Sequence, residues 1–299
     1  MESPFVGLIN ALTKPRRAPW PGTPSLSQRV DGKVVLITGA SGGLGAGLAR
    51  QVAAAGATTV VTARRSSELD RLVTEIEGSG GTAYAIAGDL STSAGVDAVA
   101  DEVLRRFGAP DVLVLNAGRS IMRSVADSES RLHDFERTLA INYLGGAGLA
   151  LRLLPGMRDR GSGHIIHSSS VAAISNLPFF AAYAGSKAAL DVVLRIAGIE
   201  ALADGVRVTN VHLPLVDTEM IAPTDWSKYA SLTLEQGVGM LVDGIRRRPR
   251  EVNNPLGALT RAAFGIAPRT VSRLQNSYYR QLVAHPLHAS SRVTDPAAN

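Results

Sequence analysis

The sequence predicts an α/β fold, a Rossmann-type doubly wound parallel sheet of about seven strands. Two observations lead to this prediction. From Lys33 onward, short β-branched and apolar runs alternate with segments of helical spacing, and such alternation is typical of βαβ units. A glycine-rich turn joins the first of these strands to the first helix, as it does in sheets of this type. The series occurs once, so we expect a single domain over residues 31–255.

The elements of this domain follow in order along the chain. Six strands are predicted, at KVVLIT (33–38), TTVVTA (58–63), TAYAIAGDL (82–90), DVLVLNAG (111–118), GHIIHSSS (163–170) and GVRVTNVHL (205–213). Helical patterns follow the first two strands, at LGAGLARQVAAAG (44–56) and SSELDRLVTEIEGSG (66–80). A loop at 213–230, a helix near 233–247 and a short strand around REVNN (250–254) complete the domain.

Both ends of the chain are predicted to lie outside this domain. Residues 1–30 form an N-terminal extension, in which an amphipathic piece (FVGLINAL, 5–12) precedes a proline-rich linker. Because apolar residues precede basic ones there, this piece is compatible with a weak peripheral contact with a membrane. Residues 256–299 form a helical tail around TVSRLQNSYYRQL (270–282), with a disordered end.

The composition excludes several classes of protein. The 299 residues contain no cysteine, which rules out disulfides and thiolate metal sites and favours a reducing compartment. No apolar run approaches the roughly 20 residues of a transmembrane helix, and the N-terminus lacks the order of a signal peptide. We therefore expect a cytoplasmic protein, with association at a membrane surface as the alternative.

The net charge of +5 is concentrated in two basic clusters, KPRR (14–17) and RRRPR (246–250). Such clusters can meet nucleic acid, anionic lipid or an anionic substrate, but each is more often a solvated face. Aromatic residues do not interleave with them, so we expect no nucleic-acid partner.

The glycine-rich turn, TGASGGLG (Thr38–Gly45), predicts a phosphate-binding loop. Gly39, Gly43 and Gly45 allow the backbone to turn tightly and to approach a pyrophosphate at the positive N-terminus of the following helix. A glycine-rich turn alone is weak evidence, but its position between a predicted strand and a predicted helix makes the signal specific.

The end of the second predicted strand indicates which nucleotide binds. Ala63, Arg64 and Arg65 stand where an acidic residue would accept hydrogen bonds from a ribose 2′-hydroxyl. Arginine instead binds a 2′-phosphate through charge-assisted hydrogen bonds. A surface arginine pair is the alternative interpretation, but this location favours NADP(H) as the cofactor.

The candidate catalytic residues begin with YAGSK, which places Tyr183 and Lys187 one helical turn apart on one face. An ammonium beside a phenol favours the phenolate, so we expect the pKa of Tyr183 to be lowered toward the range of a general acid or base. Ser170, at the end of a predicted strand, can hydrogen-bond a substrate carbonyl. Asn142, in AINYLGG, can hold a helix kink and a water in a proton relay.

Taken together, these residues resemble the short-chain dehydrogenase/reductase family from about Gly32 to Met220. Thr38–Gly45 matches the family's TGxxxGxG, which implies cofactor contacts at Gly39, Ser41, Gly43, Leu44 and Gly45. Asp89 and Leu90 match the pair at the adenine, Asn116, Ala117 and Gly118 match its NAG motif, and Thr218 matches the position at the nicotinamide carboxamide. The family's catalytic tetrad is matched by Asn142, Ser170, Tyr183 and Lys187. Leu115 departs from the family, which usually has asparagine there.

The resemblance implies a role for each member of the tetrad. Tyr183 exchanges a proton with the substrate oxygen, and Ser170 holds that oxygen. Lys187 binds the nicotinamide ribose and tunes the tyrosine, while Asn142 supports the relay. Hydride passes directly between the nicotinamide and the substrate carbon, so the resemblance implies no metal.

A closer resemblance, over about Val34–Tyr279, is to the bacterial fatty acyl-CoA reductases of this family. It rests on NAGRSI, HDFERT, LPLV, DTEMIAPT and the PLG-containing tail. It implies NADPH-dependent reduction of long-chain acyl-CoA to fatty aldehyde, and the apolar Leu215, Ile221 and Pro223 would suit a lipid chain. Leu215 replaces the glycine of the broad family's Pro-Gly, whereas Asp217 stands where the subgroup tends to have a basic residue.

Two other functions stay open from the sequence. The same tetrad could act on another hydrophobic carbonyl or secondary alcohol, such as a 3-oxoacyl lipid or a steroid. A catalytically idle NADP-binding regulator would be expected to have a broken tetrad, and here the tetrad is intact. The family resemblance also implies a homodimer that pairs through the helices carrying Asn142 and Tyr183.

Overall fold

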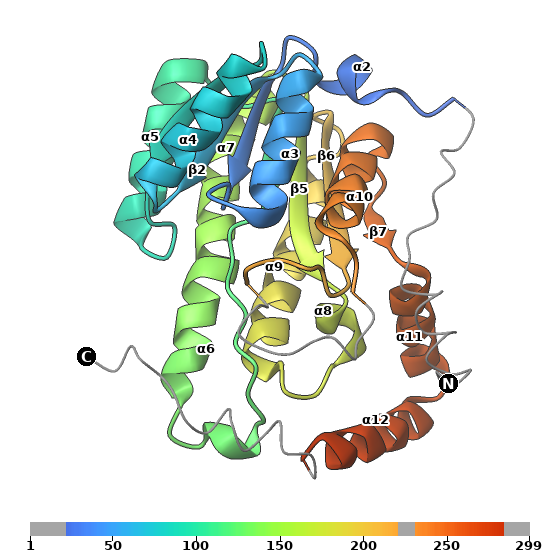
Figure 1. Ribbon diagram of the computed structural model, residues 1–299. Helices are drawn as coiled ribbons and strands as arrows, with labels where there is room; N and C mark the ends of the chain where they lie inside the picture. Colours follow the sequence, from blue (N-terminus) through green and yellow to red (C-terminus); the bar gives the residue numbers. More distant parts are fainter. Residues whose placement is uncertain (1–21, 221–230, 284–299) are drawn as a thin grey trace.

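The computed structural model describes residues 22–220 and 231–283 (Figure 1). It confirms the predicted doubly wound sheet, whose seven strands all run parallel in the order β3-β2-β1-β4-β5-β6-β7. The strands are β1 (Val34–Thr38), β2 (Thr58–Ala63), β3 (Thr82–Ala87), β4 (Val112–Leu115), β5 (Gly163–Ser170), β6 (Val206–Leu213) and β7 (Glu251–Asn253). The strand order reverses between β1 and β4, where sheets of this kind bind their ligands.

Two predicted strands end earlier than the sequence pattern indicates. β3 ends at Ala87, so Asp89 and Leu90 lie in the following loop, and β4 ends at Leu115, so Asn116–Gly118 is also a loop. The Asp89 carboxylate accepts hydrogen bonds from Ser91, and the Asn116 backbone N–H donates to the Thr38 hydroxyl. These residues therefore do not continue the pairing of the strands. Both loops leave the carboxyl edge of the sheet, where they can line a ligand site.

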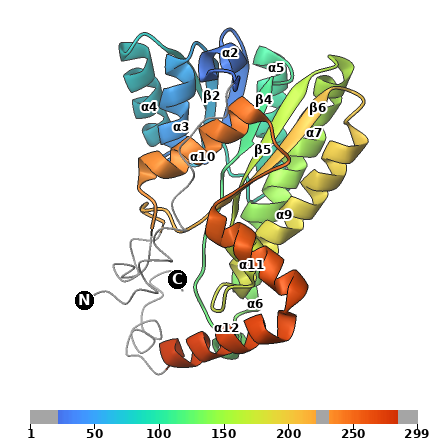
Figure 2. The same cartoon turned by 90° about the vertical axis from the view of Figure 1, so that its right-hand side faces the viewer.

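The helices cover both faces of the sheet (Figures 1 and 2). They are α2 (Leu26–Val30), α3 (Gly43–Ala54), α4 (Ser66–Gly78), α5 (Ser93–Phe107), α6 (Leu132–Leu139), α7 (Gly145–Asp159), α8 (Ala172–Ser175), α9 (Ala181–Glu200), α10 (Leu234–Arg247), α11 (Pro255–Ile266) and α12 (Pro268–Val283), with a 3₁₀ turn η1 (Ala126–Ser128) and a π-helical turn η2 (Ala140–Leu144). Within the described ranges, no helix is both long and apolar enough to cross a membrane.

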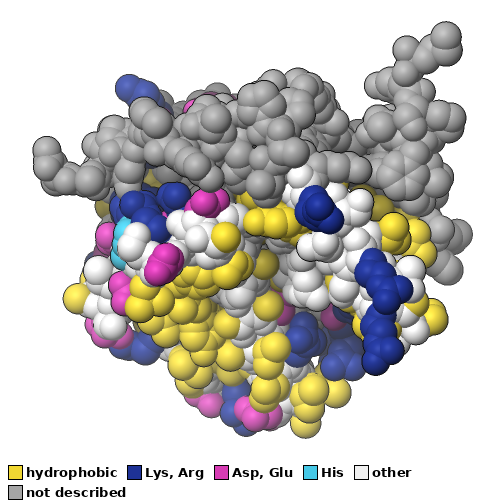
Figure 3. Space-filling view, turned by 90° about the horizontal axis from the view of Figure 1, so that it is seen from below, with side chains coloured by type: hydrophobic (Ala, Val, Ile, Leu, Met, Phe, Trp, Pro, Cys, Tyr) yellow, Lys and Arg dark blue, Asp and Glu magenta, His cyan; other side chains and the backbone are white. Residues whose placement is uncertain are grey.

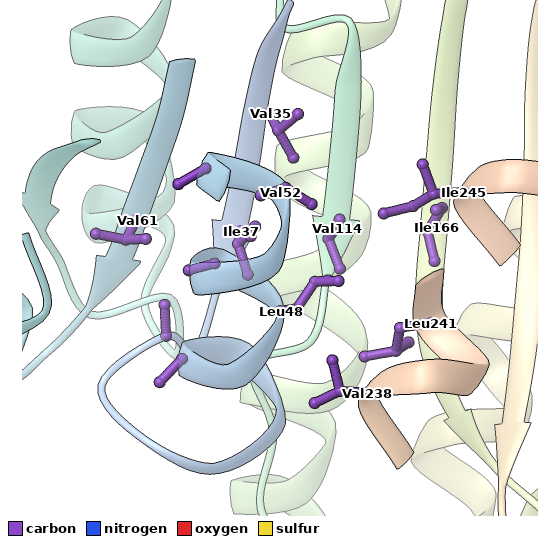
Figure 4. Packing of buried hydrophobic residues seen from close by; sticks show 14 of the residues in the cluster. Val35, Ile37, Leu48, Val52, Val61, Val114, Ile166, Val238, Leu241 and Ile245 are labelled. Atoms are coloured by element: carbon purple, nitrogen blue, oxygen red, sulfur yellow. The ribbon is translucent and has the colours of Figure 1, made fainter. Parts of the chain in front are cut away.

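Two hydrophobic clusters, one on each face of the sheet, form the core. Val35 and Ile37 of β1 point toward α3 and α10, whereas Leu36 between them belongs to the opposite cluster, which α5, α7 and α9 cover. This alternation follows from the two-residue repeat of a strand. Figure 4 shows the first cluster, in which Leu48 of α3 and Leu241 of α10 lie over the sheet. A sheet covered on both faces explains why β4 is apolar throughout and β1 is apolar up to Thr38.

The described part of the predicted N-terminal extension packs on the domain. Val30 is fully buried in the core. The Arg29 Nε donates to the carbonyl of Arg246, and the Arg246 Nε donates to the carbonyl of Pro24. Part of the basic cluster at 246–250 is therefore a structural contact for this segment. The amphipathic piece at 5–12, the cluster at 14–17, Ile221, Pro223 and the end of the tail lie outside the described residues.

The predicted helical tail is confirmed as α11 and α12, which extend along the lower side of the molecule (Figures 1 and 2). The Asn254 side chain accepts a hydrogen bond from the Gly257 backbone and begins α11. In α12, Gln275 Nε2 donates to the carbonyl of Ser175 at 2.6 Å, and the Tyr279 ring lies 5.2 Å from the Phe179 ring. The tail therefore contacts the segment that leads into α9.

Gly145 provides a test of the packing that places the Asp89–Leu90 loop against α7. A Cβ at Gly145 would collide with the backbone carbonyl of Leu90, whereas a Cβ at the exposed Gly239 in α10 would meet no atom within 4 Å. We expect Gly145→Ala to lower the free energy of unfolding by about 1–3 kcal/mol through overpacking. Gly239→Ala should raise it by up to about 1 kcal/mol through helix propensity. Urea unfolding followed by circular dichroism measures both, and equal effects would contradict this packing.

Candidate active site

The predicted phosphate loop adopts a conformation that requires glycine. Gly39 has φ +66° and Gly43 has φ +52°, a region that favours glycine over residues with a side chain. A Cβ at Gly45 would lie 2.5 Å from the carbonyl oxygen of Gly39. The N-cap of α3 is Gly42, and no side chain caps the first N–H groups of the helix. This helix terminus therefore fits the phosphate groups of a dinucleotide.

The NAG motif lies against this loop. A Cβ at Gly39 would lie 2.7 Å from the Cα of Ala117. Asn116 Nδ2 donates to the carbonyl oxygens of Thr38 and Gly39 at 3.0 and 3.3 Å, and the Thr38 hydroxyl accepts from the backbone N–H groups of Asn116 and Ala117, both at 2.9 Å. The ends of β1 and β4 are thereby joined at the point where the strand order reverses.

Arg64 and Arg65 follow the end of β2 and lie around the same loop. Arg65 Nη2 donates to the backbone and side-chain oxygens of Ser41 at 3.3 and 3.2 Å. The Asp89 carboxylate accepts hydrogen bonds from the backbone N–H and the hydroxyl of Ser91. The backbone hydrogen bond has the largest effect on the pKa of Asp89. Together with the hydroxyl and the charge of Arg64, it holds this pKa below its usual range, although partial burial opposes the shift. The two guanidinium groups could therefore hold an anionic ribose substituent beside the phosphate loop.

Leu90 and Thr218 complete the predicted cofactor contacts. Leu90 is buried beside the start of α7. The Thr218 methyl lies 3.6 Å from the position of a Cβ at Gly43, so Thr218 covers the phosphate loop. Its hydroxyl donates to the carbonyl of Val216, and the adjoining residues pair with Leu232. The sequence-predicted cofactor residues are therefore gathered around one edge of the sheet.

Asn142 lies in the π-helical turn η2, an irregular turn between α6 and α7 at the place where the sequence predicts a helix kink. Its side chain is fully engaged: Oδ1 accepts from the Arg119 N–H at 2.8 Å, and Nδ2 donates to the Arg119 carbonyl and the Ser186 hydroxyl, both at 2.9 Å. The Ser186 hydroxyl donates in turn to the carbonyl of Tyr183 at 2.7 Å. Asn142 therefore connects the segment after the NAG motif to the helix of Tyr183. No motif in the sequence predicted this role for Ser186.

Tyr183, Lys187 and Ser170 come together where β5 ends beside α9. The Ser170 hydroxyl forms a hydrogen bond with Tyr183 and accepts from the Ala172 N–H at 3.1 Å. The Lys187 ammonium is buried, and its Nζ donates to the Ser168 carbonyl at 2.8 Å. A Cβ at Gly118 would lie 3.4 Å from this Nζ and 2.9 Å from the Asn142 Oδ1. Lys187 and Asn142 therefore meet beside the NAG motif, and the Ser170–Tyr183 pair lies one turn of α9 away from Lys187.

The expected lowering of the Tyr183 pKa is wrong. Burial raises the pKa of the phenol, the hydrogen bond with Ser170 only partly opposes this, and the Asp191 carboxylate raises it further. The spacing of Tyr183 and Lys187 does place them on one face of α9, but the ammonium bonds to a strand carbonyl. Burial also lowers the pKa of Lys187 to about 8. Tyr183 is therefore held protonated, as a proton donor requires.

A pocket of about 350 Å³ lies on another side of α9 and has a mainly apolar lining. It is lined by Ala184 and Ala188 of α9, by Leu177, Pro178 and Phe179 before it, and by Val125. Viewed from below, hydrophobic side chains also gather over part of the described surface (Figure 3). The side of the tyrosine helix that faces this pocket is therefore apolar.

Comparison with known proteins agrees with this arrangement. Residues 33–228 match the short chain dehydrogenase family. An uncharacterized oxidoreductase of Mycobacterium tuberculosis is 43% identical over 256 residues, covering 84% of this chain and 75% of that protein. A fatty acyl-CoA reductase of Acinetobacter baylyi is 41% identical over 242 residues, covering 81% of this chain and 82% of that protein. The crystal structure of a metagenomic short-chain oxidoreductase in complex with NADP has a TM-score of 0.58 at 34% identity, covering 62% of this chain and 83% of that one.

The sheet, its switch point and these similarities define the protein as an oxidoreductase. The chain belongs to the short-chain dehydrogenase family.

Proposed function

We propose that the protein is an NADPH-dependent reductase of a hydrophobic carbonyl substrate, and that long-chain fatty acyl-CoA, reduced to fatty aldehyde, is this substrate. The meeting of Asn142, Ser170, Tyr183 and Lys187 at the end of β5 supports the chemistry. The 41% identity to a fatty acyl-CoA reductase over most of both chains supports the substrate.

The cofactor assignment rests on the phosphate loop and on the cations beside it. The open N-terminus of α3 takes the pyrophosphate, and Arg64 and Arg65 take the 2′-phosphate. The relative whose structure contains NADP supports the same choice. Asp89 and Leu90 lie at the adenine, Asn116–Gly118 line the loop, and Thr218 lies at the nicotinamide. When bound, NADPH supplies the hydride.

The chain's own residues manage the substrate oxygen and its proton. Ser170 donates a hydrogen bond to the thioester carbonyl, and Tyr183 gives its phenolic proton to that oxygen as negative charge develops. The product of this step is a hemithioacetal, in which the former carbonyl carbon bears a hydroxyl, a hydrogen and the CoA sulfur. Loss of the hydroxyl proton and cleavage of the carbon–sulfur bond then give the aldehyde, and the thiolate of CoA takes a proton. Lys187 holds the ribose and Asn142 supports proton return to Tyr183.

Two alternatives follow from the same site. A 3-oxoacyl lipid, a steroid or another hydrophobic ketone would use the same tetrad, and the apolar pocket beside α9 is compatible with each. An idle NADP-binding regulator would need no assembled proton donor. The fully hydrogen-bonded Asn142 and the pairing of Ser170 with Tyr183 favour an active enzyme.

The helices around the tetrad also support a homodimer. Exposed apolar side chains line one side of α9 at Val192, Ile196 and Ile199, and others lie on the neighbouring helices at Leu144 and Leu151. Soluble monomers rarely expose so many neighbouring apolar groups. We therefore propose that two copies pair through the helices that carry Asn142 and Tyr183.

Substitution of Tyr183 tests the assigned proton donor. We expect Tyr183→Phe to lower kcat at least about 100-fold, because it removes the transferable proton. NADPH affinity, measured by fluorescence titration, should change little, because the ring and its packing remain. An equal loss of affinity and turnover would contradict the role of the hydroxyl.

Substitution of Arg64 tests the cofactor choice. We expect Arg64→Ala to weaken NADPH binding by about 10- to 100-fold, the range of a hydrogen bond to a charged group, while NADH binding changes little. Arg71→Ala is the control, because Arg71 is an exposed cation on α4 paired with Glu68. An unchanged ratio of NADPH to NADH affinity in Arg64→Ala would contradict the assignment.

The substrate is tested by NADPH oxidation with palmitoyl-CoA and with a panel of hydrophobic ketones. We expect oxidation with palmitoyl-CoA, accompanied by one equivalent of free CoA detected with a thiol reagent. The chain contains no cysteine, so the protein adds no thiol background. Turnover of a ketone without thiol release from palmitoyl-CoA would favour the ketone reductase instead.

A further inference from the structure

A buried polar cluster lies between α9 and the sheet, directly behind the tyrosine–lysine pair. The sheet face under α9 is apolar where β5 and β6 begin, at Ile165 and Val206. Further along the same face it becomes polar, with His167 and Ser169 on β5 paired across the sheet with Asn210 and His212 on β6. Apolar residues would fill such positions in an ordinary core, so these polar side chains require a partner.

The common partner of the two histidines and Ser169 is the Asp191 carboxylate of α9. Its Oδ1 bonds to His167 Nδ1 at 2.9 Å, and its Oδ2 bonds to the Ser169 hydroxyl at 2.9 Å and to His212 Nε2 at 3.0 Å. All four side chains are buried. The remaining ring nitrogens, His167 Nε2 and His212 Nδ1, have no hydrogen-bond partner among the described residues. The nitrogens that face Asp191 therefore carry the protons.

The Asp191 carboxylate places a negative charge inside this cluster. Burial lowers the pKa of His167 to about 4, so its ring is neutral near neutral pH. Burial alone would raise the pKa of Asp191, but the hydrogen bonds from the two histidines outweigh it and leave the carboxyl ionised. A buried charge is costly unless another charge compensates it.

The compensating charge is the Lys187 ammonium, one turn earlier on the same face of α9. Lys187 is also buried and has the Ser168 carbonyl as an acceptor, which leaves further N–H groups for a ribose. Burial lowers the pKa of this ammonium, and the charge of Asp191 opposes that effect. Other titratable groups lie on the elements that pack against α9. Asp134 of α6 forms ion pairs with Arg123 and Arg131, and Tyr143 lies in η2.

We propose that Asp191 is a positioning residue whose fixed negative charge keeps Lys187 protonated and bound to the Ser168 carbonyl. This inference rests on the proposed function, since it assigns to Asp191 the maintenance of the charge that Tyr183 and the ribose require. The inference assigns this role to the charge of Asp191 and not to its hydrogen bonds. Asparagine separates the two, because it can keep hydrogen bonds to the same side chains when one histidine changes tautomer.

The test is Asp191→Asn, which keeps the shape and removes the charge. NADPH affinity by fluorescence titration and kcat/KM for reduction are measured from pH 6 to 9. Without Asp191, the pKa values of Lys187 and Tyr183 both fall. Reduction needs both groups protonated, so kcat/KM and NADPH affinity each fall above a certain pH, which we call the alkaline limb. In Asp191→Asn this limb should lie about one pH unit lower, since a nearby charge shifts a pKa by about one to three units. An alkaline limb that stays at its wild-type position would overturn the inference.

Variants that retain the charge provide the matched comparison. His167→Gln and His212→Gln each remove one donor but leave the carboxylate, so we expect the alkaline limb to stay in place. His164→Gln is the control for loss of a buried histidine, because His164 bonds to Thr209 on the other face of β5. A shift of the limb in the His167 and His212 variants would assign the cluster to packing alone and overturn the inference, even where Asp191→Asn does not fold. A wild-type protein that bound no NADPH would overturn the proposed function as well.

Discussion

The close approach of the glycine-rich turn to the end of β4 is the contact on which the rest of the site depends. Gly39 and Ala117 are too near for a side chain to lie between them, and the Thr38 hydroxyl and the Asn116 amide join their backbones. Gly118 then lies against both Asn142 and Lys187. One run of contacts therefore leads from the phosphate loop to the tetrad, so that cofactor and proton donor share one rigid support.

Burial accounts for the electrostatics of this site. Burial of this part of α9 raises the pKa of Tyr183 and lowers that of Lys187. A reductase needs the phenol protonated, so the first shift assists the chemistry, whereas the second works against the lysine. A carboxylate placed behind both groups raises both pKa values, which explains why a buried negative charge is compatible with this fold.

The sequence predicted the fold well because each strand of the sheet is a separate apolar run and each junction has its own turn residues. Motif positions likewise predicted which residues meet at the carboxyl edge. The direction of the Tyr183 pKa could not be predicted, because spacing along a helix does not reveal burial. The Asp191 cluster was missed because it depends on the register that pairs Ser169 with His212 across β5 and β6. The docking of α2 was missed because it depends on a hydrogen bond from Arg29 to the backbone of Arg246, a residue far away in the sequence.

The C-terminal helices contact one strained segment that precedes α9. Phe179 has φ +71°, a conformation that is strained for a bulky residue and persists only where its surroundings hold it. Its carbonyl accepts from the Arg123 N–H at 2.7 Å, its ring packs against Tyr279 of α12, and Gln275 holds the start of the same segment at Ser175. Because this segment leads into α9 four residues before Tyr183 and lines the apolar pocket, the tail is coupled to the region beside the proton donor. The part of the chain that extends beyond the matched family region therefore adjoins the apolar pocket beside α9.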